Sequence, residues 1–100
     1  MKSALAIQCL PQGVSGKSET YRLVDRAIEV LDATGLPYTV GGFETVVEGP
    51  LDQLFAVAQA MHQAVLDAGG PGIATYMKVF SSPELGSTEE KTGKFRARGH

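Results

Sequence analysis

The sequence is poor in the residues that build covalent cross-links and metal sites. It contains one cysteine and two histidines in 100 residues. The single cysteine, Cys9, cannot form an internal disulfide, and neither histidine lies at a metal-ligand spacing from it. The sequence therefore predicts no metal site and no disulfide framework, and it favours the reducing cytoplasm.

The sequence also lacks a strong excess of positive or negative charge and a long hydrophobic run. Nine lysines and arginines against eleven acidic residues give a net charge of −2, so the chain is not built to neutralise a phosphate backbone. The apolar stretch 4–10 contains Gln8 and is too short for a secretory signal or a spanning helix. We expect a soluble, unprocessed protein that has neither a nucleic acid nor a membrane as its partner.

The remaining composition suits one small globular domain. Hydrophobic residues make up 43% of the chain and charged residues 20%, close to the globular average. β-favouring runs cover 3–10, 38–43, 45–48 and 73–80, while helical spacing of apolar residues covers 21–31 and 51–66. Gly35 and Gly69 are typical stops for the two helices. The two short runs at 38–43 and 45–48 form either a tight hairpin or one bent ribbon.

The order β-α-β-β-α-β predicts an α+β, ferredoxin-like fold of the split βαβ kind. We expect a four-stranded antiparallel sheet with both helices on one face. After residue 82 the chain becomes polar, and the segment 87–90 matches a capping box. The sequence therefore predicts a ligand-binding domain at 1–82 and an extension at 83–100 that forms a short helix.

Alternation along the strands separates two sheet faces. Leu5, Ile7 and Cys9 share the face expected to meet the helices, while Ala4, Ala6 and Gln8 share the other. The later strands add further residues to this second face: Glu44, Glu48, Tyr76 and Lys78. A mixture of small, aromatic and charged residues is unusual for a plain solvent face. We infer a covered or ligand-facing surface, and a homodimer or a dimer of dimers with sheets packed face to face.

The segment Gly16-Lys17-Ser18, between a strand and a helix, is similar to a phosphate-binding loop. The full motif requires a glycine five residues before Gly16, and Pro11 stands there. We interpret the segment as a flexible loop that ends in a serine N-cap, with contact to an anion or another ligand as the alternative.

Two carboxylates and two aromatic residues are candidates for binding. Glu44 and Glu48 lie four residues apart on one strand, so they face the same way and could serve as a structural pair, in acid/base chemistry, or as contacts to a cationic ligand. Phe43 and Tyr76 are either packing residues or stacking platforms. His62 lies on the apolar side of its helix without a Ser, Cys or Asp relay nearby in sequence, so we expect a hydrogen-bonded core or interface histidine and no catalytic residue.

Over residues 3–80 the chain resembles the thiamine/hydroxymethylpyrimidine-binding family of small ferredoxin-like proteins. The resemblance rests on the order and spacing of short segments: Pro11-Gln12-Gly13, the helix 21–31, Gly35-Leu36-Pro37-Tyr38, the run Thr45-Val46-Val47-Glu48-Gly49, and Met61-His62. It implies dimers or tetramers with sheets packed face to face, a ligand on the open sheet face, and no catalytic activity.

The resemblance also implies site residues. Thr45 and Glu48 match the family's Thr-x-x-Glu-Gly motif and are the first ligand-contact candidates. The chain departs from the family at Gln8, where a serine is common, and at Glu44, where a small or amide residue is common. The full candidate set is Gln8, Phe43, Glu44, Thr45, Glu48 and Tyr76.

Three functions follow from these observations. The first is non-catalytic binding of thiamine or its hydroxymethylpyrimidine moiety near a subunit interface, without a cofactor. The second is a homo-oligomeric assembly or regulatory module that binds no small molecule. The third is a small acylphosphatase-like phosphohydrolase, which would need an arginine in the loop 11–18, where the chain has only Lys17.

Overall fold

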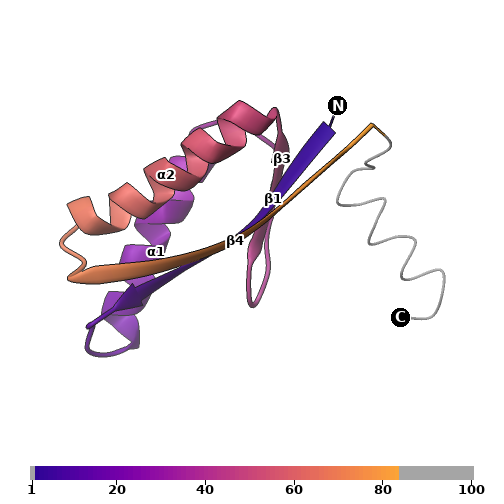
Figure 1. Cartoon of the computed structure of the whole chain (residues 1–100). Coiled ribbons are helices and arrows are strands. Elements are labelled where there is room, and N and C mark those ends of the chain that lie inside the picture. The colour runs from indigo at the N-terminus through magenta and orange to yellow at the C-terminus, as the bar shows by residue number, and fades with distance from the viewer. Residues whose placement is uncertain (1, 84–100) are drawn as a thin grey trace, which may run out of the picture.

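The structure, a computed structural model, describes residues 2–83 (Figure 1). Its elements are β1 (Lys2–Gln12), α1 (Lys17–Asp32), β2 (Tyr38–Val40), β3 (Thr45–Gly49), α2 (Leu51–Asp67) and β4 (Gly72–Ser82). The helix expected within 87–98 and most of the expected extension lie outside the described residues.

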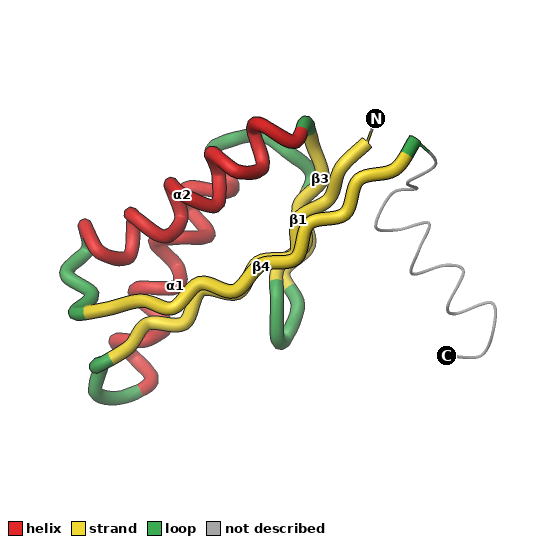
Figure 2. The backbone as a smooth tube through the Cα atoms, in the orientation of Figure 1, coloured by secondary structure: helices red, strands yellow, loops and turns green. Residues whose placement is uncertain are grey.

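The four strands form one antiparallel sheet in the order β2-β3-β1-β4. Both helices lie on the same side of this sheet (Figures 1 and 2), and their buried residues form one core with those of β1 and β3. The predicted ferredoxin-like arrangement is therefore confirmed. We call the uncovered side of the sheet the open face.

The two long strands extend further than the sequence predicts. β1 and β4 pair without interruption from Lys2 opposite Ser82 to Gln12 opposite Gly72. Pro11 does not end β1, because the β1–β3 pairing has already stopped at Ile7 opposite Thr45. A proline is tolerated in a strand where one side carries no neighbouring strand.

The segment between β2 and β3 is a hairpin turn. β2 ends at Val40, three residues earlier than predicted, because the Gly41 N–H donates to the Glu44 carbonyl oxygen at 3.0 Å and closes the turn. The tight hairpin is thus the correct one of the two alternatives.

The two helices begin and end at glycine and proline signals. Gly35 after α1 and Gly69 after α2 have positive φ angles of 75° and 94°, which confirms the predicted helix stops. The predicted serine N-cap of α1 is wrong: the cap residue is Gly16, and no side chain caps it. The chain enters the helix at Gly16 with a φ of 86°, and this places Ser15 before the cap and Ser18 inside the helix.

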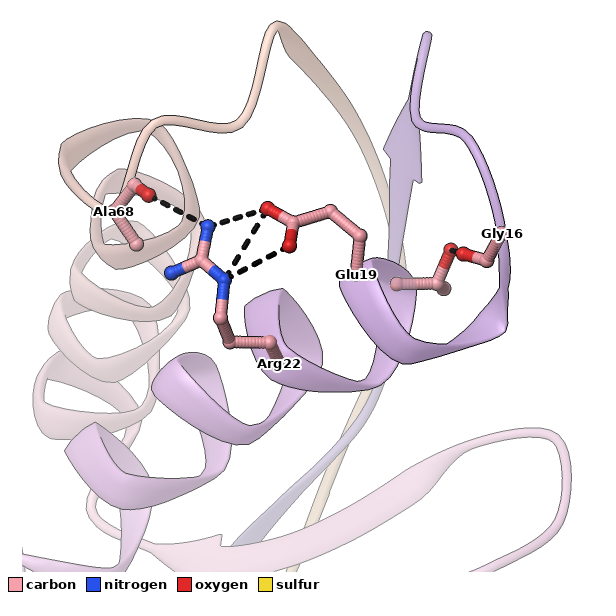
Figure 3. Close-up of polar contacts among 5 residues, drawn as sticks. Gly16, Glu19, Arg22 and Ala68 are labelled. Atoms are coloured by element: carbon pink, nitrogen blue, oxygen red, sulfur yellow. Dashed lines mark hydrogen bonds and ion pairs between the residues drawn. The ribbon is translucent and has the colours of Figure 1, made fainter.

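An arginine connects the two helices at one end (Figure 3). Arg22 of α1 donates to the carbonyl oxygen of Ala68, at the C-terminus of α2, over 3.0 Å, and it also pairs with Glu19. The hydrogen bond and the charge of Arg22 lower the pKa of Glu19 below its ordinary range. A positive charge at a helix C-terminus also complements the helix dipole. Arg22 therefore positions the start of α1 against the end of α2.

Candidate functional site

The open face carries a pocket of about 400 Å³. Three segments distant in sequence surround it, namely β1, the β2–β3 turn and β4. The lining residues are Ala6, Gln8, Glu44, Tyr76, Met77 and Lys78. This volume falls in the range of small-molecule sites.

The strand register explains why the face is hollow at this position. Ala6 on β1 stands opposite Lys78 of β4 on one side and Val46 of β3 on the other. Gln8, the next residue on this face, stands opposite Tyr76. Because Ala6 has only a methyl group, the longer side chains around it leave a depression with an apolar base and polar walls.

An ion pair crosses the pocket. Lys78 Nζ lies 3.2 Å from Glu44 Oε1, and it joins β4 to the β2–β3 turn. Both side chains reach solvent, with 76% of Lys78 and 37% of Glu44 exposed. Exposed pairs of this kind contribute no more than about 1 kcal/mol. The pair can therefore open and offer both charges to a ligand.

Three predicted site residues meet in the pocket: Gln8, Glu44 and Tyr76. Glu48 also lies on the open face, but it stands opposite Ala4, closer to the N-terminal end of β1. Phe43 lies in the hairpin turn with 87% of its surface exposed, and it does not line the pocket.

Thr45 does not join this group. It stands opposite Ile7 on the helix-covered face and is only 6% exposed. Alternation along β3 places Thr45 and Val47 on the helix-covered face and Val46 and Glu48 on the open face, so Thr45 cannot project into the open face. The family motif marked Thr45 by its spacing alone, whereas alternation along β3 assigns it to the core.

Sequence reasoning placed Lys78 on this face but did not include it in the site. The signal that could have identified it was a lysine and a glutamate on the same face of one sheet, because β1, the strand between them, has only the short Ala6 side chain opposite Lys78 and leaves the two charges within reach of each other. Lys78 and Glu44 are 34 positions apart in the chain, so the pairing depends on the register of the sheet.

A second polar cluster lies on the helix-covered side. His62 Nδ1 of α2 and Thr75 Oγ1 of β4 are 2.7 Å apart, and Thr75 Oγ1 lies 4.0 Å from Cys9 Sγ. His62 is therefore hydrogen-bonded, as the sequence predicts. Burial raises the pKa of the Cys9 thiol, and the weaker effect of the Thr75 hydrogen bond lowers it.

We expect Cys9 to react slowly with a chromogenic disulfide reagent, with a pH-rate midpoint above the ordinary thiol pKa of about 8.5. The raised pKa means that less thiolate is present at any given pH. Replacing Thr75 with valine removes the contact that favours the thiolate, so Thr75→Val should move the midpoint higher still. Thr39→Val, at an exposed strand position, is the matched control. A midpoint at or below 8.5 in the unmodified protein would contradict this assignment.

Residues 2–83, which the structure describes, offer no site for a metal ion built from clustered side chains. Within that range no group of three or more His, Cys, Asp or Glu side chains is placed to hold a metal ion. The described helices are also too short or too polar to cross a membrane.

Comparisons with known proteins agree on one family. A family model described as "Thiamine-binding protein" matches residues 5–96. A UPF0045 protein of Clostridium perfringens is 28% identical over 92 residues, which cover 92% of this chain and 95% of that protein.

Solved structures share the fold. A domain of unknown function, DUF77, from Bacillus cereus superposes with a TM-score of 0.83 at 34% identity and covers 98% of this chain and 93% of its own. A candidate thiamine biosynthesis or salvage protein from Thermotoga maritima superposes with a TM-score of 0.82 at 23% identity, over 96% of this chain and all of the other.

Proposed function

Because the chain belongs to the thiamine-binding protein family, we propose that its open-face pocket binds thiamine or the hydroxymethylpyrimidine moiety and catalyses no reaction. The observation that supports this site best is the Glu44 carboxylate, which lines a pocket of about 400 Å³ beside the ring of Tyr76. In this proposal the protein acts in the cytoplasm as a carrier, buffer or sensor of the ligand.

Each lining group matches a part of such a ligand. Thiamine contains a permanently cationic thiazolium ring and a neutral aminopyrimidine. The Glu44 carboxylate can accept from the amino group or offset the thiazolium charge. Tyr76, which is 61% exposed, offers a ring face for stacking. The Gln8 amide can both donate to and accept from the ring nitrogens and the amino group.

A second copy of the chain could complete the site. Tyr76 and Phe80 both lie on the open face and are 61% and 57% exposed. A dimer or tetramer with sheets packed face to face would cover these rings and enclose the pocket, and desolvation would strengthen the polar contacts of the ligand. Self-association through this face is part of the proposal. If the chain self-associates through this face but binds no small molecule, its function is that of an assembly module.

Calorimetric titration with thiamine and with hydroxymethylpyrimidine tests the proposal. We expect saturable binding of one or both in the micromolar range or tighter. Glu44→Gln should weaken thiamine binding about ten-fold or more, because a hydrogen bond to a charged group contributes about 1.5 to 3 kcal/mol. Glu48→Gln should have a smaller effect, since Glu48 does not line the pocket.

Glu29→Gln is the matched control. Glu29 is an exposed residue of α1 that pairs with Arg26, on the opposite side of the sheet from the pocket. Its substitution should leave the affinity unchanged. Absence of saturable heat with both ligands would overturn the binding proposal and favour the assembly module. An equal loss of ligand affinity in Glu29→Gln and Glu44→Gln would show that the ligand does not bind in the pocket.

A further inference from the structure

The proposed function leaves the lysine in the pocket unexplained. A thiazolium ring that approaches Glu44 meets Lys78, whose ammonium group already lies 3.2 Å from that carboxylate. Two cations would then share one carboxylate. A site that served only a cationic ligand would gain affinity if position 78 were neutral.

The charges lining the pocket are balanced. Glu44 and Lys78 contribute one negative and one positive charge, and the other lining residues are neutral side chains: Ala6, Gln8, Tyr76 and Met77. When a ligand with a single positive charge binds, the site holds one unbalanced positive charge. A ligand that carries a cation at one end and an anion at the other gives each protein charge an opposite partner.

The geometry allows both partners to be reached. The Lys78 side chain is 76% exposed and has a flexible four-carbon stem, so its ammonium group can turn away from Glu44 at small cost. Lys78 and Tyr76 follow each other on the open-face side of β4, opposite Ala6 and Gln8. A ring stacked on Tyr76 with its cation at Glu44 would therefore leave its other end close to Lys78.

We propose, on the basis of the proposed function, that the Glu44–Lys78 pair makes the pocket selective for a ligand that combines a cationic ring with a phosphate ester. Glu44 takes the ring charge, and the Lys78 ammonium group, released from Glu44, takes the phosphate. The phosphate ester of thiamine consequently binds more tightly than thiamine itself.

The test compares the affinities of thiamine and thiamine monophosphate by calorimetry at low salt. We expect the unmodified protein to bind the monophosphate about ten-fold more tightly, with the preference falling as sodium chloride is added. Lys78→Met keeps most of the length of the side chain and removes its charge, so the two affinities should become equal. Lys17→Met, at the start of α1 and outside the pocket, should keep the ten-fold ratio.

The outcomes separate this inference from the proposed function. If thiamine binds and the unmodified protein shows no preference for the monophosphate, the inference is overturned and the proposed function stands. A preference that persists in Lys78→Met overturns the role of Lys78. If neither compound binds the unmodified protein, both proposals fail. Thermal unfolding verifies that Lys78→Met is folded, and Lys78→Gln replaces it if it is not.

Discussion

Replacing Leu5 with alanine is expected to lower the free energy of unfolding by about 2 to 5 kcal/mol. Leu5 is fully buried on β1, a central strand of the sheet, and belongs to the core formed with both helices. Removing three carbons there loses the transfer free energy of the side chain and leaves a cavity that the packed helices fill only in part. Urea-induced unfolding at constant pH measures the loss.

Leu10→Ala is the matched control for this prediction. Leu10 is the same residue type on the same strand, but 36% of its surface is exposed. Its truncation should cost about 1 kcal/mol or less, because much of the side chain is in water before and after unfolding. Equal losses in the two variants would contradict the assignment of Leu5 to the core and of Leu10 to the surface.

Replacing Gly41 with alanine is expected to damage both the fold and the pocket. A Cβ atom at this position would lie 2.7 Å from the carbonyl oxygen of Glu44, which is too close for any real contact. The obstacle is backbone, and the Gly41 N–H already donates to the same oxygen at 3.0 Å, so no rotamer change relieves it. The β2–β3 turn must open, and this displaces Glu44 from Lys78.

We expect Gly41→Ala to lose about 1 to 3 kcal/mol of stability, as overpacked sites do. We also expect it to bind thiamine at least ten-fold more weakly, as Glu44→Gln should. Gly42→Ala is the control, because a Cβ atom there meets nothing within 4 Å. Thermal unfolding and calorimetry on both variants measure the two effects. If the Gly41 and Gly42 variants behave alike, the turn does not position Glu44.

Much of the fold was predictable because its signals are local. The helical spacing of apolar residues identified α1 and α2, and glycine in a left-handed conformation ended both. Alternation along β1 correctly assigned Leu5 and Ile7 to the core and Gln8 to the other face. The strand ends were less predictable: β1 and β4 extend further because each stabilises the other over eleven residue pairs.

The candidate site was predicted only in part. Alternation and family resemblance together selected Gln8, Glu44 and Tyr76, which line the pocket. The resemblance also selected Thr45, which is buried on the other face. A motif records which residue types occur at which spacing, and it does not record the direction in which each side chain points.

The sequence by itself determined the order of the elements and the face of the sheet on which the strand residues lie, because periods of two and of 3.6 residues are properties of a short stretch of chain. Its short motifs also carried the resemblance to the family. The tertiary structure alone decided which residues of different strands stand opposite each other. That register places Ala6 at the base of a pocket and brings Lys78 to Glu44 across 34 positions of sequence. It depends on the packing of the whole sheet against two helices, which no local pattern encodes.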